Sequence, residues 1–191
     1  MIWTILKSVV ITAPVLEPVS LAEVKLHLRV DISTDDTLIT ALIAAARQMV
    51  EERIGISLLT QTRDVYGLTF PTGTVLTLPY GPVQSVTGVY YTETDSANES
   101  TFDATSYLTQ VWRDAVVLKS GYTWPNNATM RVRYVAGYTA AASVPQRIKQ
   151  AILLIIGHWY ENREATQGTT VRELPLAVES LLNLERVHWG L

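Results

Sequence analysis

The hydrophobic pattern of the chain predicts an α+β fold in which helical segments flank a β-rich part. Apolar residues recur with a helical period over residues 20–54, alternate as in strands over residues 58–137, and return to a helical period over residues 143–187. Neither helical pair can bury a two-sided apolar surface alone. We therefore expect one four-helix bundle, formed by the N- and C-terminal helical segments, with a small antiparallel β-rich part inserted between the pairs.

The same changes of period divide the 191 residues into three parts. Residues 1–57 hold an N-terminal arm and two helices, and residues 58–137 are the β-rich insertion. Residues 138–191 hold two further helices and a C-terminal tail. We expect the two helical parts to pack as one domain, since the total length suits one compact domain or two small ones.

Helix start and stop signals mark the first helical part. Ser20 and Glu23 form an S-x-x-E capping box, in which each side chain satisfies an orphan backbone N–H of the helix start. A longer helix is expected from about Asp35 to Ile54. Gly55 follows it and is placed to end that helix in the left-handed conformation.

The second helical part carries similar signals. Ser143 and Gln146 predict a second capping box, and the final helix is expected to begin near Pro175. Residues 148–159 are apolar around most of the helix circumference. Such a helix is buried on most sides, either in a core or against another subunit.

The middle part contains about five or six short strands. Residues 107–112 and 115–119 are separated by a two-residue turn signal and are expected to form a hairpin. Residues 93–106 are polar and lack apolar periodicity, so we expect a long exposed loop there. Arg131 and Arg133 alternate with apolar residues and form a basic strand face, which at this net charge is expected to be a solvated surface.

Composition excludes several classes of function. The formal net charge is −3, which argues against a protein that grips nucleic acid mainly through phosphates. The absence of cysteine excludes disulfide scaffolds, cysteine nucleophiles, zinc fingers and iron–sulfur sites. The longest strongly apolar run, residues 151–157, is far shorter than the roughly 20 residues of a membrane-spanning helix, so no membrane partner is expected.

No catalytic, metal-binding or cofactor-binding constellation is found in the sequence. His158 and Glu161 have the i, i+3 spacing seen in carboxylate metal bundles, but those sites need a second such pair and further glutamates on facing helices. We therefore expect no enzyme activity, no metal and no cofactor.

Six residues are instead candidates for an interface with other subunits or a partner protein. Arg147 and Lys149 lie in the first turns of a helix, where cations oppose the helix dipole, and should pair with carboxylates of the same or a neighbouring chain. Three of the other four are Trp or Tyr residues, which are enriched among interface anchors. The fourth is a leucine close to one of them in the C-terminal tail. These four residues are Trp159, Tyr160, Trp189 and Leu191. For Trp159, burial in the helical core is the favoured alternative.

Two sets of residues together carry a family resemblance. The first comprises residues 18–25 (PVSLAEVK), 27–30 (HLRV), 35–39 (DDTLI) and 44–47 (AAAR), and the second comprises residues 144–151 (VPQRIKQA) and 157–164 (GHWYENRE). In this order they resemble the head–tail connector (adaptor) proteins of tailed phages and prophages. The long β-rich part is similar to that of the larger members of the family.

The resemblance implies a structural virion protein, made in the host cytoplasm and located in the neck at the head–tail junction. Such proteins form a homo-oligomeric ring, usually of twelve subunits, on the portal protein. The ring extends the channel through which DNA passes without sequence-specific binding, and it docks a stopper or tail-completion protein. A slightly acidic chain suits such a channel.

Two other classes of function stay open from the residues alone. An enzyme with its site in the β-rich part would need two or three titratable groups that converge in a pocket. A carbohydrate- or host-binding module would need aromatic side chains exposed in a line on one sheet face.

Overall fold

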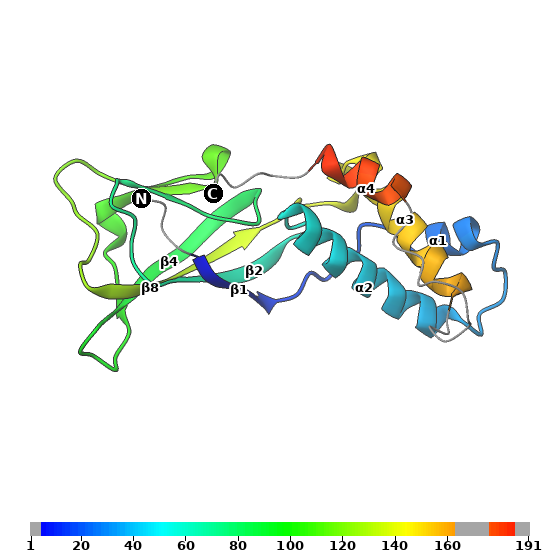
Figure 1. The fold of residues 1–191 in the computed structure, drawn as a ribbon, viewed down its shortest axis with the longest axis horizontal. Coiled ribbons are helices and arrows are strands. Elements are labelled where there is room, and N and C mark those ends of the chain that lie inside the picture. Colours follow the sequence, from blue (N-terminus) through cyan, green and yellow to red (C-terminus); the bar gives the residue numbers. More distant parts are fainter. Residues whose placement is uncertain (1–4, 163–175, 186–191) are drawn as a thin grey trace. The chain divides into compact units, whose positions relative to one another are not determined.

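The computed structural model describes residues 5–162 and 176–185. These residues form an α+β structure of four α-helices and eight strands (Figure 1). They divide into two compact units, each with its own core. Residues 5–14 and 60–137 make up the β unit, and residues 15–59 together with the described residues from 138 onward make up the helical unit.

The β unit contains two antiparallel sheets. The larger has five strands in the order β1 (Ile5–Thr12), β2 (Gln61–Gly67), β8 (Ala128–Ala136), β4 (Val83–Glu93) and β5 (Ser100–Thr101). The smaller has the order β3 (Val75–Thr77), β7 (Ala115–Leu118) and β6 (Tyr107–Gln110). The expected hairpin of residues 107–119 is therefore present, with a 3₁₀ turn at Val111–Arg113.

The alternation of apolar residues in β8 explains how the larger sheet buries one face. Met130, Val132 and Tyr134 are buried, whereas Arg131 and Arg133 point to the other face and stay partly exposed. Buried residues of β2, β3, β4 and β7 complete the same core. This core contains residues from strands of both sheets, so the β unit has a substantial core of its own.

The helical unit is built around α3 (Gln146–Glu161), which contacts α1 (Leu21–Leu28), α2 (Asp36–Ile54) and α4 (Leu176–Asn183) (Figure 1). Ile148, Ile152 and Ile155 of α3 are fully buried in its core. The three neighbouring helices explain why α3 is apolar on several sides. An ion pair between Arg53 and Glu179 also joins α2 to α4.

The helix ends match the sequence signals in the first half of the chain. The Glu23 amide donates to Ser20 Oγ at 3.2 Å, and the Ser20 amide donates to Glu23 Oε2 at 2.7 Å, which completes the capping box. Gly55 ends α2 with φ 72°. The predicted second capping box is wrong, because Ser143 belongs to a 3₁₀ turn and α3 begins only after Pro145.

The expected four-helix bundle with a small β insertion is also wrong. The strands make two sheets with a separate core, and the larger sheet begins with β1, which precedes every described helix. The β unit therefore does not arise from one segment inserted between helix pairs. The physical reason lies in β2, which pairs with β8 on one side and with β1 on the other. Without β1, the backbone N–H and C=O groups along one side of β2 would be unpaired.

The expected loop over residues 93–106 contains more order than the sequence indicated. Ser100 and Thr101 form β5 beside Tyr90 and Tyr91 of β4. The Phe102 amide donates to the carbonyl of Val89 at 2.8 Å. This segment therefore closes one edge of the larger sheet over part of its length.

Candidate interaction surfaces

The two arginines of the basic strand face are held by carboxylates of their own chain. Arg133 donates from Nε and Nη2 to the two oxygens of Asp64, both at 2.8 Å, and Arg131 Nη1 donates to Asp64 Oδ2 at 3.1 Å. Arg131 also makes a two-pronged ion pair with Glu99, at 2.7 and 2.5 Å. Such charge-assisted pairs fix the orientation of both guanidinium groups.

The network also sets the ionisation of its carboxylates. Asp64 is only 1% exposed, and burial alone opposes its charge, but the two guanidinium groups outweigh that effect and hold its pKa below the usual range. Hydrogen bonds from Arg131 likewise lower the pKa of Glu99. The predicted basic face is thus neutralised internally, which removes most of its attraction for phosphates.

Tyr90 and Gly88 complete this network. The Arg131 guanidinium lies 4.0 Å from the centroid of the Tyr90 ring, a cation–π contact. A Cβ atom on Gly88 would lie 2.8 Å from the Tyr90 hydroxyl. The missing side chain at position 88 therefore leaves room for the ring beside the arginine.

The aromatic residues of the β unit gather mainly inside it. Phe70, Phe102, Tyr107 and Trp124 stack or tilt against one another, with ring centroids 5.1–6.5 Å apart. This arrangement is a core cluster, and these four rings do not form the exposed line that a carbohydrate-binding face requires.

The aromatic side chain of Trp112, in contrast, is strongly exposed. Trp112 lies in the turn between β6 and β7 and is 80% exposed, with Val111 beside it at 44%. Asp114 follows this turn with φ 50°, and its carboxylate accepts a hydrogen bond from the Val83 amide at 2.6 Å. We call residues 108–113 the hairpin tip.

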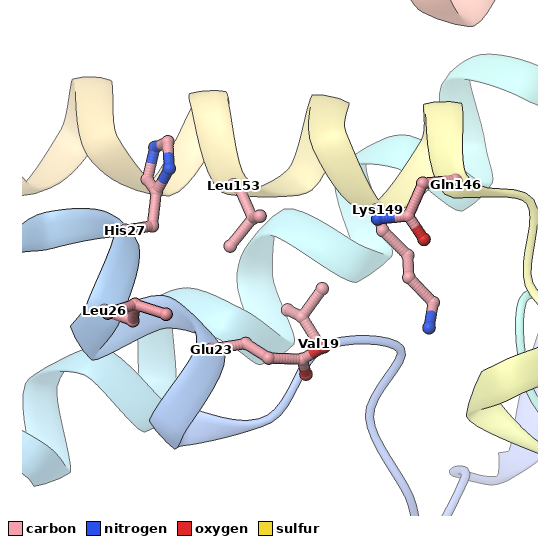
Figure 2. A pocket seen from close by; sticks show the side chains of 7 residues that line it. All are labelled: Val19, Glu23, Leu26, His27, Gln146, Lys149 and Leu153. Atoms are coloured by element: carbon pink, nitrogen blue, oxygen red, sulfur yellow. The ribbon is translucent and has the colours of Figure 1, made fainter.

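A groove lies between α1 and α3 in the helical unit (Figure 2). It encloses about 270 Å³, and its apolar lining includes Leu26 from α1 and Leu153 from α3. Glu23 and Lys149 add one charge of each sign to its rim. The pKa of Glu23 is lowered, first by the hydrogen bonds from the backbone and side chain of Ser20 and then by the charge of Lys149.

Four of the six predicted interface residues lie in the described chain. Arg147 pairs with Glu185, with 3.3 Å between Nε and Oε1, so one of the two helix-start cations finds its carboxylate within the chain. Lys149 lines the α1–α3 groove. Trp159 and Tyr160 are half-buried against the helical core, and the Tyr160 hydroxyl donates to Asp35 Oδ2 at 2.5 Å.

Trp189 and Leu191 lie outside the described residues. Sequence reasoning missed both the hairpin tip and the groove. A signal existed for the tip, because an indole beside a turn has few residues nearby to cover it. The groove gave no signal, because it depends on the packing of two helices far apart in sequence.

The described residues contain no group of three or more His, Asp or Glu side chains that could hold a metal ion. Their largest charged network, around Asp64, is held in mutual ion pairs. Within the same ranges, no helix combines the length and the apolar character needed to cross a membrane.

Comparison with protein families decides the identity. Residues 17–173 match the sequence model of the family described as "HCP: Head completion protein". The chain belongs to the head completion protein family. The predicted relationship to the head–tail connectors is thereby confirmed, and with it a structural role in connecting head and tail.

Three solved structures with this fold come from gene transfer agent (GTA) particles. A chain in the neck of an empty GTA particle, computed with C6 symmetry, is 20% identical with a TM-score of 0.75. Chains from the native GTA virion and from a native GTA neck computed with C12 symmetry are each 21% identical, with TM-scores of 0.76 and 0.67. Each match covers 97% of this chain and 98% of the other, and it shows the shared fold. None of the curated proteins compared with the chain matches it significantly.

Proposed function

We propose that this head completion protein forms a ring of twelve subunits in the virion neck, between the portal protein and a stopper or tail-completion protein. The family match over residues 17–173 carries the proposal. The fold supports it, because chains of the same fold belong to GTA necks, one of them computed with C12 symmetry. The protein would act in the assembled particle after synthesis in the host cytoplasm.

The proposed role needs a channel that DNA can traverse without being held. The net charge of −3 and the internal neutralisation of Arg131 and Arg133 support such a role, since a negative net charge and paired arginines weaken the attraction for phosphates. This role also needs no catalytic step. We propose on this basis that the protein is not an enzyme and uses no cofactor.

The interface is proposed to include the six candidate residues. Lys149 lines an open groove, and Arg147 keeps 55% of its side chain exposed despite its ion pair with Glu185. Trp159 and Tyr160 are half-buried and retain some exposed surface. We propose that Trp189 and Leu191 anchor the C-terminal segment on the portal or on an adjacent subunit, because buried Trp side chains are typical interface anchors.

Tail joining in vitro tests the proposed function. DNA-filled heads from a producer strain that lacks the gene are incubated with purified tails, with or without the purified protein and the remaining neck proteins. Joined particles counted by negative-stain microscopy should appear only when the protein is added. Equal joining without it would refute the connector role.

A further inference from the structure

The hairpin tip has the features of a protein–protein anchor. Leu108, Val111 and Trp112 are 51%, 44% and 80% exposed, and they lie within five residues of the chain. Single exposed apolar residues are common, but a cluster that contains an exposed indole marks an interaction surface.

The tip is held firmly by the residue that follows it. Asp114 donates its amide to the Val111 carbonyl at 3.3 Å and accepts from the Leu78 amide at 2.7 Å. Its carboxylate also accepts from the Val83 amide and leaves no space for a side chain on Gly81. A tip fixed in advance loses little conformational entropy when it binds.

The α1–α3 groove has the size and lining for one large side chain. Its volume of about 270 Å³ is smaller than the roughly 300–1,000 Å³ of small-molecule sites. Leu26 on its rim is 82% exposed, so its side chain is free to pack against a partner. Figure 2 shows Leu26 and Leu153 reaching toward the groove from the two helices.

The charges of the tip and the groove are complementary. Arg113 is exposed beside Trp112 and has no ion pair with any carboxylate of the described residues. Glu23 uses Oε2 for both hydrogen bonds from Ser20, and Oε1 accepts none from the described residues. Lys149 on the opposite rim can contact the face of an indole.

We propose that the hairpin tip of one copy docks in the α1–α3 groove of the next copy, with Trp112 between Leu26 and Leu153 and with Arg113 facing Glu23. This inference rests on the proposed ring. A cyclic ring of more than two subunits needs two different surfaces on each subunit that fit each other. The tip and the groove are two such surfaces.

Cross-linking in assembled necks tests the contact. The chain has no cysteine, so Thr109→Cys in the tip and Ala22→Cys, one helical turn before Leu26 on α1, can be combined without background reaction. Both positions are exposed, and neither is one of the residues that make the proposed contact. Necks that carry both substitutions are treated with a short bis-maleimide and analysed by denaturing gel electrophoresis. The expected product is a ladder from dimer to closed ring, whereas either single variant should give no ladder.

A control pair tests whether the ladder reports a specific contact. Glu52 is an exposed carboxylate on α2 that does not line the groove, and Thr109→Cys with Glu52→Cys should give no ladder. Adding Trp112→Ala to the first pair should weaken the contact between tip and groove about 30-fold, as expected of a hot-spot residue. The amount of cross-linked product on the gel should therefore fall sharply. Tyr122→Ala, which truncates an exposed aromatic side chain of the β unit outside the tip, should leave the ladder intact.

Each outcome has a defined meaning. Rings in the neck without the Thr109–Ala22 ladder would overturn the tip–groove contact and leave the proposed function standing. Necks without any ring of this chain would overturn both. If Trp189→Ala removes the ladder and Trp112→Ala does not, the C-terminal segment occupies the groove and the inference is wrong. A cross-linked product that joins the cysteine beside the groove to a different neck protein, and not to another copy of this chain, would also overturn the inference.

Discussion

The carboxylate of Asp114 occupies the space that a side chain at position 81 would need. A Cβ atom on Gly81 would lie 2.2 Å from Asp114 Oδ2 and 2.6 Å from Cγ. The same carboxylate accepts a hydrogen bond from the Val83 amide, so it cannot move without losing that bond. Glycine at position 81 thus lets Asp114 fix the end of the hairpin tip.

Gly81→Ala should therefore destabilise the β unit. Overpacking of this kind costs about 1–3 kcal/mol, and displacement of Asp114 would add the loss of a part-buried hydrogen bond. Chemical denaturation measures the change in the free energy of unfolding. Gly73→Ala is the matched control, because a Cβ there would meet no atom within 4 Å, and it should change stability by less than about 0.5 kcal/mol. Equal effects of the two substitutions would contradict the packing described for Gly81.

Asp64→Asn should destabilise the protein at neutral pH by about 1–2 kcal/mol, because it removes the counter-charge that Arg131 and Arg133 share. The effect stays below that of a fully buried pair, since Arg133 is partly exposed and Arg131 keeps its ion pair with Glu99. The pKa of Asp64 is lowered in the folded state. Its stabilising contribution is therefore present above the ordinary aspartate pKa of about 3.9 and is lost as the pH falls below it. The difference between wild type and variant, measured by denaturation from pH 7 to pH 3, should shrink as the pH falls. A constant difference would contradict the ion-pair account.

Asp114 should have the opposite pH dependence. Burial raises its pKa in the folded state, so its contribution is most favourable below pH about 3.9 and is lost as the pH rises through the raised value. Asp114→Asn keeps an oxygen for the Val83 amide and removes the buried charge. At pH 7 the variant should be as stable as wild type or more stable by about 1 kcal/mol. A variant that loses stability relative to wild type as the pH rises from 4 to 7 would contradict this expectation.

Gly157→Ala should be neutral or stabilising. Gly157 lies inside α3, where glycine costs about 0.5–1 kcal/mol relative to alanine. A Cβ atom there would lie 3.5 Å from His27 Nε2, an ordinary contact. Thermal unfolding should show an unchanged or higher midpoint, and a fall of several degrees would mean that α1 and α3 pack more tightly than described.

Local signals predicted local structure well. The Ser20–Glu23 capping box and the Gly55 helix end are present, because their interactions span at most four residues. The capping box predicted at Ser143 was wrong for an equally local reason, because Ser143 belongs to a 3₁₀ turn that precedes α3. The overall architecture was harder to predict, because pairing of β1 with β2 joins residues that are 50 (Thr12 and Thr62) to 62 (Ile5 and Gly67) positions apart in the sequence.

The candidate site shows the same limit. Arg131 and Arg133 were visible as a strand face, but their neutralisation by Asp64 depends on the register between β2 and β8. The exposure of Trp112 and Leu26 likewise follows from tertiary packing. Sequence resemblance, in contrast, indicated the family correctly, because it compares residues in their order along the chain and does not depend on knowing the tertiary contacts.

Cryo-electron microscopy of the intact neck tests the central claim most directly. Particles are reconstructed without imposed symmetry, and this chain is located by its β unit and helical unit. The connector account predicts twelve copies in one ring on the portal, around a channel that contains DNA. A neck in which the chain is absent, or is present as isolated copies outside the channel axis, would contradict the account.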